Sequence, residues 1–153
     1  MKTIDEQMMR AALDEARLAQ SEGELPIGAI ITRDHEIIAR GHNLREQTKD
    51  PSAHAEIVAI RRAAQIVGDW RLNDLTMYVT LEPCPMCAGA IVMARLHRVV
   101  FGAYDEQAGC AGSRYRITED PSFNHFAPAT GGVLQDECAQ LLAAFFRLDR
   151  RGN

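Results

Sequence analysis

Two short segments of the sequence carry side chains that can bind a metal ion and move protons: His54-Ala55-Glu56 and Pro83-Cys84-Pro85-Met86-Cys87. Together they supply one imidazole, two thiols and one carboxylate. A structural zinc ion takes four protein ligands, whereas a catalytic zinc ion takes three and keeps its fourth position for water. The sequence therefore predicts a catalytic site for one Zn²⁺ per subunit, with three ligands and one proton carrier: His54, Cys84, Cys87 and Glu56.

The spacing of these residues predicts which elements position them. Cys84 and Cys87 are three residues apart across the expected start of a helix, which puts both sulfurs on one face. A helix amino terminus has free N–H groups and positive dipole character, which favour the thiolate form. His54 stands at the expected start of another helix. We therefore expect two helix amino termini to converge at the carboxyl edge of a parallel sheet, where open α/β sheets usually place their sites.

These groups are suited to hydrolysis. Two thiolates and a neutral imidazole balance the charge of Zn²⁺, and zinc lowers the pKa of a bound water from about 16 towards 7. Glu56 is then free to take the proton of that water, to protonate a ring nitrogen of a substrate, and finally to protonate the departing ammonia. A carboxylate in this role typically contributes about 10²–10⁴-fold to the rate.

Two other uses of the cysteines remain open at this point. A Cys-x-x-Cys pair at a helix start also fits a thioredoxin-like redox site. A structural zinc site completed by Cys110 or Cys138 is the second alternative. The segment His54-Ala55-Glu56 upstream, and Pro83 directly before Cys84, favour the catalytic site over both.

Hydrophobic periodicity and turn residues predict the elements that carry the site. Strands separated by helices indicate a mostly parallel sheet covered on both faces. We expect an α/β fold, a three-layer α/β/α sandwich around a mixed, mostly parallel five-stranded sheet. The predicted helices are 4–21, 54–67, 85–94 and 136–148, and the predicted strands are 27–32 and 36–41, paired as a hairpin, then 77–81, 98–101 and 127–130.

Composition sets further limits. The 153 residues, with 46% hydrophobic and 25% charged content, fit a single domain spanning 1–153. No run approaches the roughly 18 apolar residues of a membrane span, and the first residues lack the apolar region of a secretory signal. We therefore expect a cytoplasmic protein without a membrane partner, whose cysteines are thiols or metal ligands. The net charge of -4 does not indicate nucleic-acid binding, although local clusters can still provide it.

Beyond the metal segments, the sequence resembles a specific family, the bacterial tRNA-specific adenosine deaminases of the cytidine deaminase-like superfamily. The metal segments alone match the signature of all zinc nucleobase deaminases. The run from Val79 to Gly89 and the ending with Phe145-Phe146 are more specific, and the likeness extends from about Met8 to Arg147. It also includes Asn43, 98–103, 109–113, Asn124-His125, 132–134 and Glu137-Cys138.

This resemblance implies hydrolytic conversion of the wobble adenosine of a tRNA anticodon stem-loop, expected in an arginine tRNA, to inosine. It also implies a homodimer in which both subunits shape the RNA groove. Asn43 would hold the flipped nucleoside, and the backbone N–H of Ala55 would steady the reacting centre. Asp105 matches the family aspartate that contacts the ribose of the preceding nucleotide, although a solvated loop acid is an alternative for it.

The sequence departs from the family pattern in two places. Glu106-Gln107 stands where relatives often carry lysine, and Arg114-Tyr115-Arg116 replaces a more apolar segment with charge and an aromatic ring. Scattered cations could form a positively charged rim for RNA, or simply a solvated surface: Arg45, Lys49, Arg71, Arg95, Arg98, Arg114, Arg116, Arg147, Arg150 and Arg151.

Two rival functions remain to be separated. One is a deaminase of free nucleobases or nucleosides, such as guanine or cytosine, on the same fold. The other is a zinc-binding module without turnover, against which Glu56 argues because a structural centre does not need that acid. The sequence does not specify which tRNA is edited or what Cys110, Cys138 and His125 do.

Overall fold

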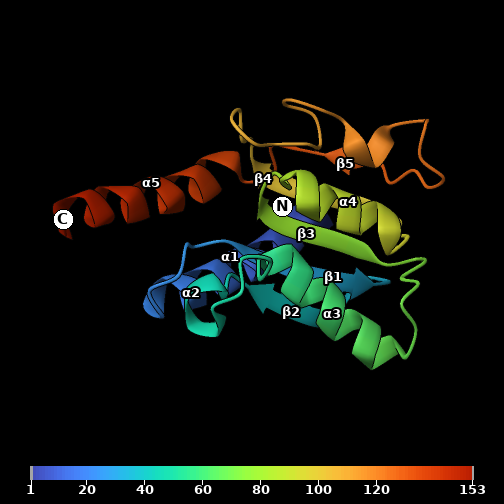
Figure 1. The fold of residues 1–153 in the computed structure, drawn as a ribbon, viewed down its shortest axis with the longest axis horizontal. Coiled ribbons are helices and arrows are strands. Elements are labelled where there is room, and N and C mark those ends of the chain that lie inside the picture. Colours follow the sequence, from blue (N-terminus) through green and yellow to red (C-terminus); the bar gives the residue numbers. More distant parts are fainter. Residues whose placement is uncertain (1, 153) are drawn as a thin grey trace.

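The computed structural model of the protein describes residues 2–152, and their side chains as far as Leu148. Within this range helices and strands alternate after an initial helix and hairpin (Figure 1). The elements are α1 (Ile4–Ser21), β1 (Gly28–Arg33), β2 (Glu36–His42), α2 (Arg45–Thr48), α3 (Ala55–Val67), β3 (Thr76–Leu81), α4 (Pro85–Met93), β4 (Arg98–Ala103), the 3-10 helix η1 (Ile117–Glu119), β5 (Ala129–Thr130) and α5 (Gln135–Gly152).

The strands form one five-stranded sheet in the order β2-β1-β3-β4-β5. β1 is antiparallel to both of its neighbours, whereas β3, β4 and β5 pair in parallel. Four strands therefore run in one direction and only β1 runs against them, which confirms the prediction of a mixed, mostly parallel sheet. Because of this arrangement, the carboxyl ends of β2, β3 and β4 lie at the same edge of the sheet.

Helices cover both faces of this sheet, as the predicted three-layer sandwich requires (Figure 1). Side chains of successive strand residues point to opposite faces, so each strand contributes to two cores. One core joins α3 and α4 to the sheet through Ala55, Ala59, Ala63, Ile91, Met77, Val79 and Val99. The other joins α1 and the first turns of α5 through Met9, Ala12, Leu13, Cys138, Ile30, Tyr78 and Val100.

Small residues let α3 approach the sheet closely. Ala55, Ala59 and Ala63 are fully buried at helical spacing on the face that meets the strands. Opposite them is Gly41 of β2, where a Cβ atom would lie 2.7 Å from both the Ala55 carbonyl oxygen and the Ala59 nitrogen. Only glycine fits there, and the close contact fixes the start of α3 relative to the end of β2.

The predicted elements agree with the structure, apart from their lengths and two short additions. The hairpin is confirmed, and Asp34 and His35 at its tip both have positive φ, as a two-residue turn of this kind requires. β5 is shorter than predicted because the Ala127 N–H bonds to Thr118 instead of extending the strand. α2 and η1 were not predicted, since elements of three or four residues carry no periodic signal. Within the described range, no helix is both long and apolar enough to cross a membrane.

A charged cluster attaches the start of α1 to the edge of the sheet away from the strands' carboxyl ends. Both guanidinium nitrogens of Arg98 donate to Asp5, at 3.0 and 2.7 Å, and the Tyr78 hydroxyl donates to the same carboxylate at 3.0 Å. The hydrogen bond from Arg98 holds the pKa of Asp5 below its usual 3.8. Burial, and then the hydrogen bond to Asp5, raise the pKa of Tyr78 to about 12.

This cluster predicts a pH-dependent contribution to stability. Because the folded-state pKa of Asp5 is lowered, its contribution is complete above 3.8 and is lost as the pH falls through the folded-state value. Asp5→Asn should lower the free energy of unfolding by about 1–2 kcal/mol at about pH 7, and by less at about pH 3, in urea titrations.

Asp14→Asn is the matched control on the same helix, since its pair with Arg17 is highly exposed. It should change the free energy of unfolding by less than about 0.5 kcal/mol. If Asp5→Asn lowered the free energy of unfolding equally at both pH values, the ionised carboxylate of Asp5 would not be the source of the stabilisation.

Candidate active site

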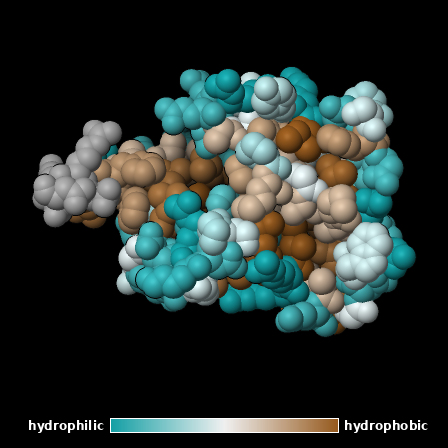
Figure 2. Space-filling view, in the orientation of Figure 1, coloured by the Kyte–Doolittle hydropathy of each residue, from teal (hydrophilic) through white to brown (hydrophobic). Residues whose placement is uncertain are grey.

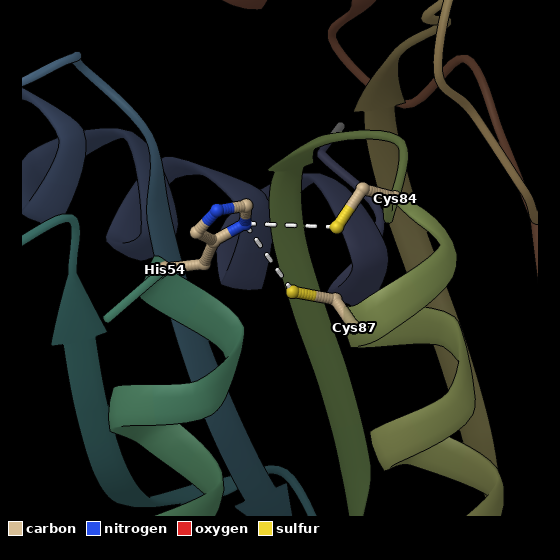
Figure 3. A group of neighbouring side chains, drawn as sticks. All are labelled: His54, Cys84 and Cys87. Carbon is tan, nitrogen blue, oxygen red and sulfur yellow. Dashed lines mark hydrogen bonds between the residues drawn. The ribbon is translucent and has the colours of Figure 1, made fainter. Parts of the chain in front are cut away.

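The imidazole of His54 and the sulfurs of Cys84 and Cys87 meet in one small triangle (Figure 3). The Nδ1 atom of His54 lies 3.6 Å from the Cys84 Sγ and 3.5 Å from the Cys87 Sγ. His54 directly precedes α3, and Cys84 directly precedes α4. The structure thus brings together all three predicted ligands, from two helix starts at the carboxyl edge of the sheet.

The dimensions of this triangle suit a tetrahedral metal ion. An ion about 2.3 Å from sulfur and about 2.05 Å from nitrogen, with tetrahedral angles, places the two donors about 3.6 Å apart. The observed nitrogen–sulfur distances of 3.6 and 3.5 Å match this spacing. Among the described residues, this is the one group of three or more such side chains close enough to hold an ion. Neither Cys110 nor Cys138 belongs to it, which argues against a four-ligand structural site.

Both helices begin without a side-chain cap, so their first N–H groups have no partner of that kind. Their positive ends therefore support negative charge on the thiols. Hydrogen bonds from Cys87 and then His54 lower the pKa of Cys84 to about 4. The pKa of Cys87 is raised, first because it donates to Cys84 and then because it is buried. The pair thus shares one negative charge, and a divalent cation would stabilise the second thiolate.

Glu56 lies in the first turn of α3, two residues after His54, and its side chain is only 4% exposed. Burial raises its pKa to about 7, and the nearby Cys84 thiolate adds to this shift. A carboxyl group with a pKa near neutrality can both take and return a proton, as a general acid and base must. Its position beside the metal triangle fits the predicted proton carrier.

The segments with Asn43 and Ala55 lie beside the triangle. Asn43 directly follows β2 and is buried. The backbone N–H of the next residue, Leu44, donates to the Ala53 carbonyl at 3.0 Å. This bond places the end of β2 next to the residues that lead into His54. Ala55 is the first residue of α3 and is fully buried, with its N–H in the uncapped first turn. Their contacts with a nucleoside remain predictions.

Asp105 follows β4 at the same edge of the sheet and is partly buried. Its Oδ1 atom accepts hydrogen bonds from the backbone of Gln107 at 3.0 Å and of Ala108 at 3.1 Å. The structure therefore gives Asp105 a role in closing its own turn. The predicted ribose contact is neither supported nor opposed by these bonds.

Two buried carboxylates that the sequence analysis missed hold the loops around the site. Glu82, 2% exposed, accepts hydrogen bonds from the backbone N–H groups of Asp105, Ala111 and Ser113, and from the Ser113 hydroxyl. Glu24, fully buried, accepts the N–H groups of Glu46 and Gln47 at the start of α2, just after Asn43. For Glu82, its place directly after a buried strand was the available signal, but the partners of both acids are too far along the chain to predict.

Several members of the proposed cationic rim have other partners. Arg98 pairs with Asp5 at the opposite edge, beside a cavity of about 580 Å³ that holds none of the predicted site residues. Arg71 and Arg95 both lie over the Trp70 ring, beyond the carboxyl ends of α3 and α4. The side chains of Arg150 and Arg151 lie outside the described residues. The rim is therefore smaller than the sequence suggested.

Comparisons with known proteins agree with this fold and site. Residues 4–126 match the family described as MafB19-like deaminase. The tRNA-specific adenosine deaminase of Bacillus subtilis (strain 168) is 50% identical over 145 residues, covering 95% of this chain and 90% of that protein. A solved structure from a study of A-to-I editing by tRNA:A34 deaminases at the wobble position of transfer RNA has a TM-score of 0.85 and 41% identity, covering 89% of this chain and 99% of that one.

A guanine deaminase from Bacillus subtilis is a more partial match, with a TM-score of 0.63 and 40% identity over 68% of this chain and 66% of its own. The fold and the site together define a deaminase. Within that class, the chain belongs to the family of tRNA-specific adenosine deaminases. The family resemblance expected from the sequence is thereby confirmed.

Proposed function

We propose that the protein converts the wobble adenosine of a tRNA anticodon to inosine by hydrolysis, with an arginine tRNA as its substrate. The observation that carries this proposal is the triangle of His54, Cys84 and Cys87 beside the buried Glu56. The similarity to a tRNA-specific adenosine deaminase, 50% identity over 95% of this chain, supports the choice of substrate.

The metal of this site is proposed to be one Zn²⁺ per subunit, held by His54, Cys84 and Cys87. Two thiolates and one imidazole are donors that zinc favours, and three protein ligands leave the fourth position open. Zinc, when bound, supplies the Lewis acidity that makes hydroxide available from water near neutral pH.

The protein's own residues then manage the protons. Glu56 accepts one proton of the attacking water and passes it to a ring nitrogen of adenine. It then accepts the second proton, from the hydroxyl group now on the ring carbon, and gives it to the amine, which leaves as ammonia while the carbonyl of inosine forms. Water thus replaces the amino group, and adenosine becomes inosine with no other reactant. The raised pKa of Glu56 supports this exchange in both directions. Asn43 would hold the nucleoside, and the Ala55 N–H would steady the reacting centre.

A substrate comparison tests this function. The purified protein should form inosine in an anticodon stem-loop that contains the wobble adenosine, and leave free guanine, cytosine and adenosine unchanged. Products are separated by chromatography after nuclease digestion. A stem-loop with guanosine at the wobble position is the matched control. Turnover of free bases with inert RNA would instead favour the free-base alternative.

Replacing the proton carrier tests the chemistry separately from metal binding. Glu56→Ala should lower kcat by about 10²–10⁴-fold, because the proton transfers lose their catalyst. Its zinc content should remain one ion per subunit by metal analysis, since Glu56 is not a ligand. Glu36→Ala, at an exposed position of the hairpin on the opposite edge of the sheet, is the control. Normal activity in Glu56→Ala, or full activity after a chelator removes the metal, would refute the proposed mechanism.

We also propose that the protein is a homodimer that uses the outer face of α4. All residues of α4 are apolar, and a helix that is apolar around its whole circumference is normally buried. Here Met86 and Met93 remain exposed, Met93 by 69%, and a Cβ on Gly89 between them would meet open space. Apolar surface covers much of the face on which α3 and α4 lie (Figures 1 and 2). A second copy covering this face would account for its composition.

If α4 forms the dimer interface, a charged residue introduced on its outer face should prevent dimer formation. Met93→Glu should convert the wild-type dimer to a monomer in sedimentation velocity, because the new charge would be buried without a partner. Leu18→Glu, at an apolar site on α1 that is 48% exposed, should leave the dimer intact. A monomeric wild type, or a dimeric Met93→Glu, would exclude this interface.

We further propose that residues 1–153 act as one domain in the cytoplasm. All five strands of the described range belong to a single sheet, and a single unfolding transition in the urea titrations would agree with one domain. A tRNA substrate and four free cysteines fit the cytoplasm.

A further inference from the structure

The loop after β4 carries a tight turn, residues 109–116, that presents an aromatic ring between two arginines. The Gly112 N–H donates to the Tyr115 carbonyl at 2.9 Å, and the Arg114 N–H donates to the Gly109 carbonyl at 2.9 Å. Ala111 and Arg116 form an isolated β-bridge across the turn. Tyr115 is 66% exposed at its tip.

This turn is fixed directly beside the metal ligands. The Cys110 N–H donates to the carbonyl of Pro83, the residue before Cys84, at 2.8 Å. Glu82 accepts the Ala111 and Ser113 N–H groups at 3.1 and 2.8 Å. A Cβ on Gly109 would collide with the Glu82 carboxylate, so the turn and the end of β3 are in close contact. The tip therefore has a defined position relative to the site.

Folding alone does not explain the side chains at the tip. Through the described part of the chain, the Tyr115 and Arg114 side chains have no hydrogen bond or ion pair within the protein. Arg116 forms an ion pair with Glu119 at 3.7 Å, but its side chain is still 73% exposed. An exposed aromatic ring flanked by exposed guanidinium groups is the combination that binds single-stranded nucleic acid, through base stacking and phosphate contacts. In a chain with a net charge of -4, such local cations are needed to attract RNA.

We propose that Tyr115 stacks on an unpaired base of the anticodon loop, next to the target nucleotide, while Arg114 and Arg116 contact its phosphates. This inference rests on the proposed RNA substrate and adds a binding element that belongs to this chain's own sequence. The turn binds RNA and takes no part in the chemistry.

Removing the ring should weaken RNA binding with little effect on the chemical step. Binding of a fluorescent stem-loop is measured by anisotropy in the inactive Glu56→Ala background. Tyr115→Ala and Tyr115→Leu should each raise Kd by about 5- to 100-fold, because a stacked base is lost. Tyr115→Phe, which keeps the ring, should bind within about twofold of the parent. In the active enzyme the defect should appear in KM rather than in kcat.

The arginines should be distinguishable from the ring by their salt dependence. Replacing Arg114 and Arg116 together by glutamine should reduce the slope of log binding constant against log salt by about 1.4, since two phosphate contacts are lost. The ring variants should leave this slope unchanged. Arg33→Gln, an exposed arginine on the hairpin at the opposite edge, is the control and should not change it.

The two proposals can fail separately. If the wild type edits the stem-loop but Tyr115→Ala and Tyr115→Leu bind it as tightly as the parent, the stacking role is refuted and the editing function stands. If the wild type neither binds nor edits RNA, the proposed function itself fails. Because Tyr115 is exposed, both variants should keep their zinc and their urea midpoint, and these measurements accompany the binding data.

Discussion

The meeting of two uncapped helix starts at one edge of the sheet is the constraint on which the site depends. α3 is held against the strands by a row of buried alanines and by Gly41, which leaves no room for a side chain. α4 follows β3 after a short connection that contains Cys84. Because β2, β3 and β4 end at the same edge, the loop that follows each of these strands lies beside the site. A shift of α3 along the sheet would separate His54 from both thiols.

Buried carboxylates around this edge have two different uses. Glu56 is buried beside the metal triangle, and burial, with the nearby Cys84 thiolate, raises its pKa to about 7. Glu82 and Glu24 are buried as well, but each accepts several backbone N–H groups. Such hydrogen bonds compensate the loss of hydration and make an acid a structural anchor. The same side-chain chemistry thus serves catalysis or loop positioning according to its partners.

Sequence patterns predicted most of this arrangement because they depend on local physics. Helical spacing revealed α1, the turn residues Pro51-Ser52 and Gly68 marked the ends of α3, and the polar tip at Asp34 and His35 revealed the hairpin that reverses β1. The metal ligands were predicted from residue type and spacing alone. α2 could not be predicted, because four residues carry no periodic signal, and the exact length of β5 and the loop contacts of Glu82 depend on hydrogen bonds between residues far apart in the chain. The side-chain partners of Arg95 and Arg98 were missed for the same reason.

The way Glu82 binds its loop has a consequence for how this enzyme family can diversify. Apart from one serine hydroxyl, the carboxylate contacts only main-chain N–H groups, which every residue except proline provides. Substitutions at positions 106–108 and 114–116 can therefore alter the outer surface while the main chain keeps its course beside the predicted metal ligands. New side chains at the tip can therefore change which RNA the loop contacts without moving the residues of the hydrolytic site. The sequence of this loop can vary while the catalytic residues and their positions stay the same.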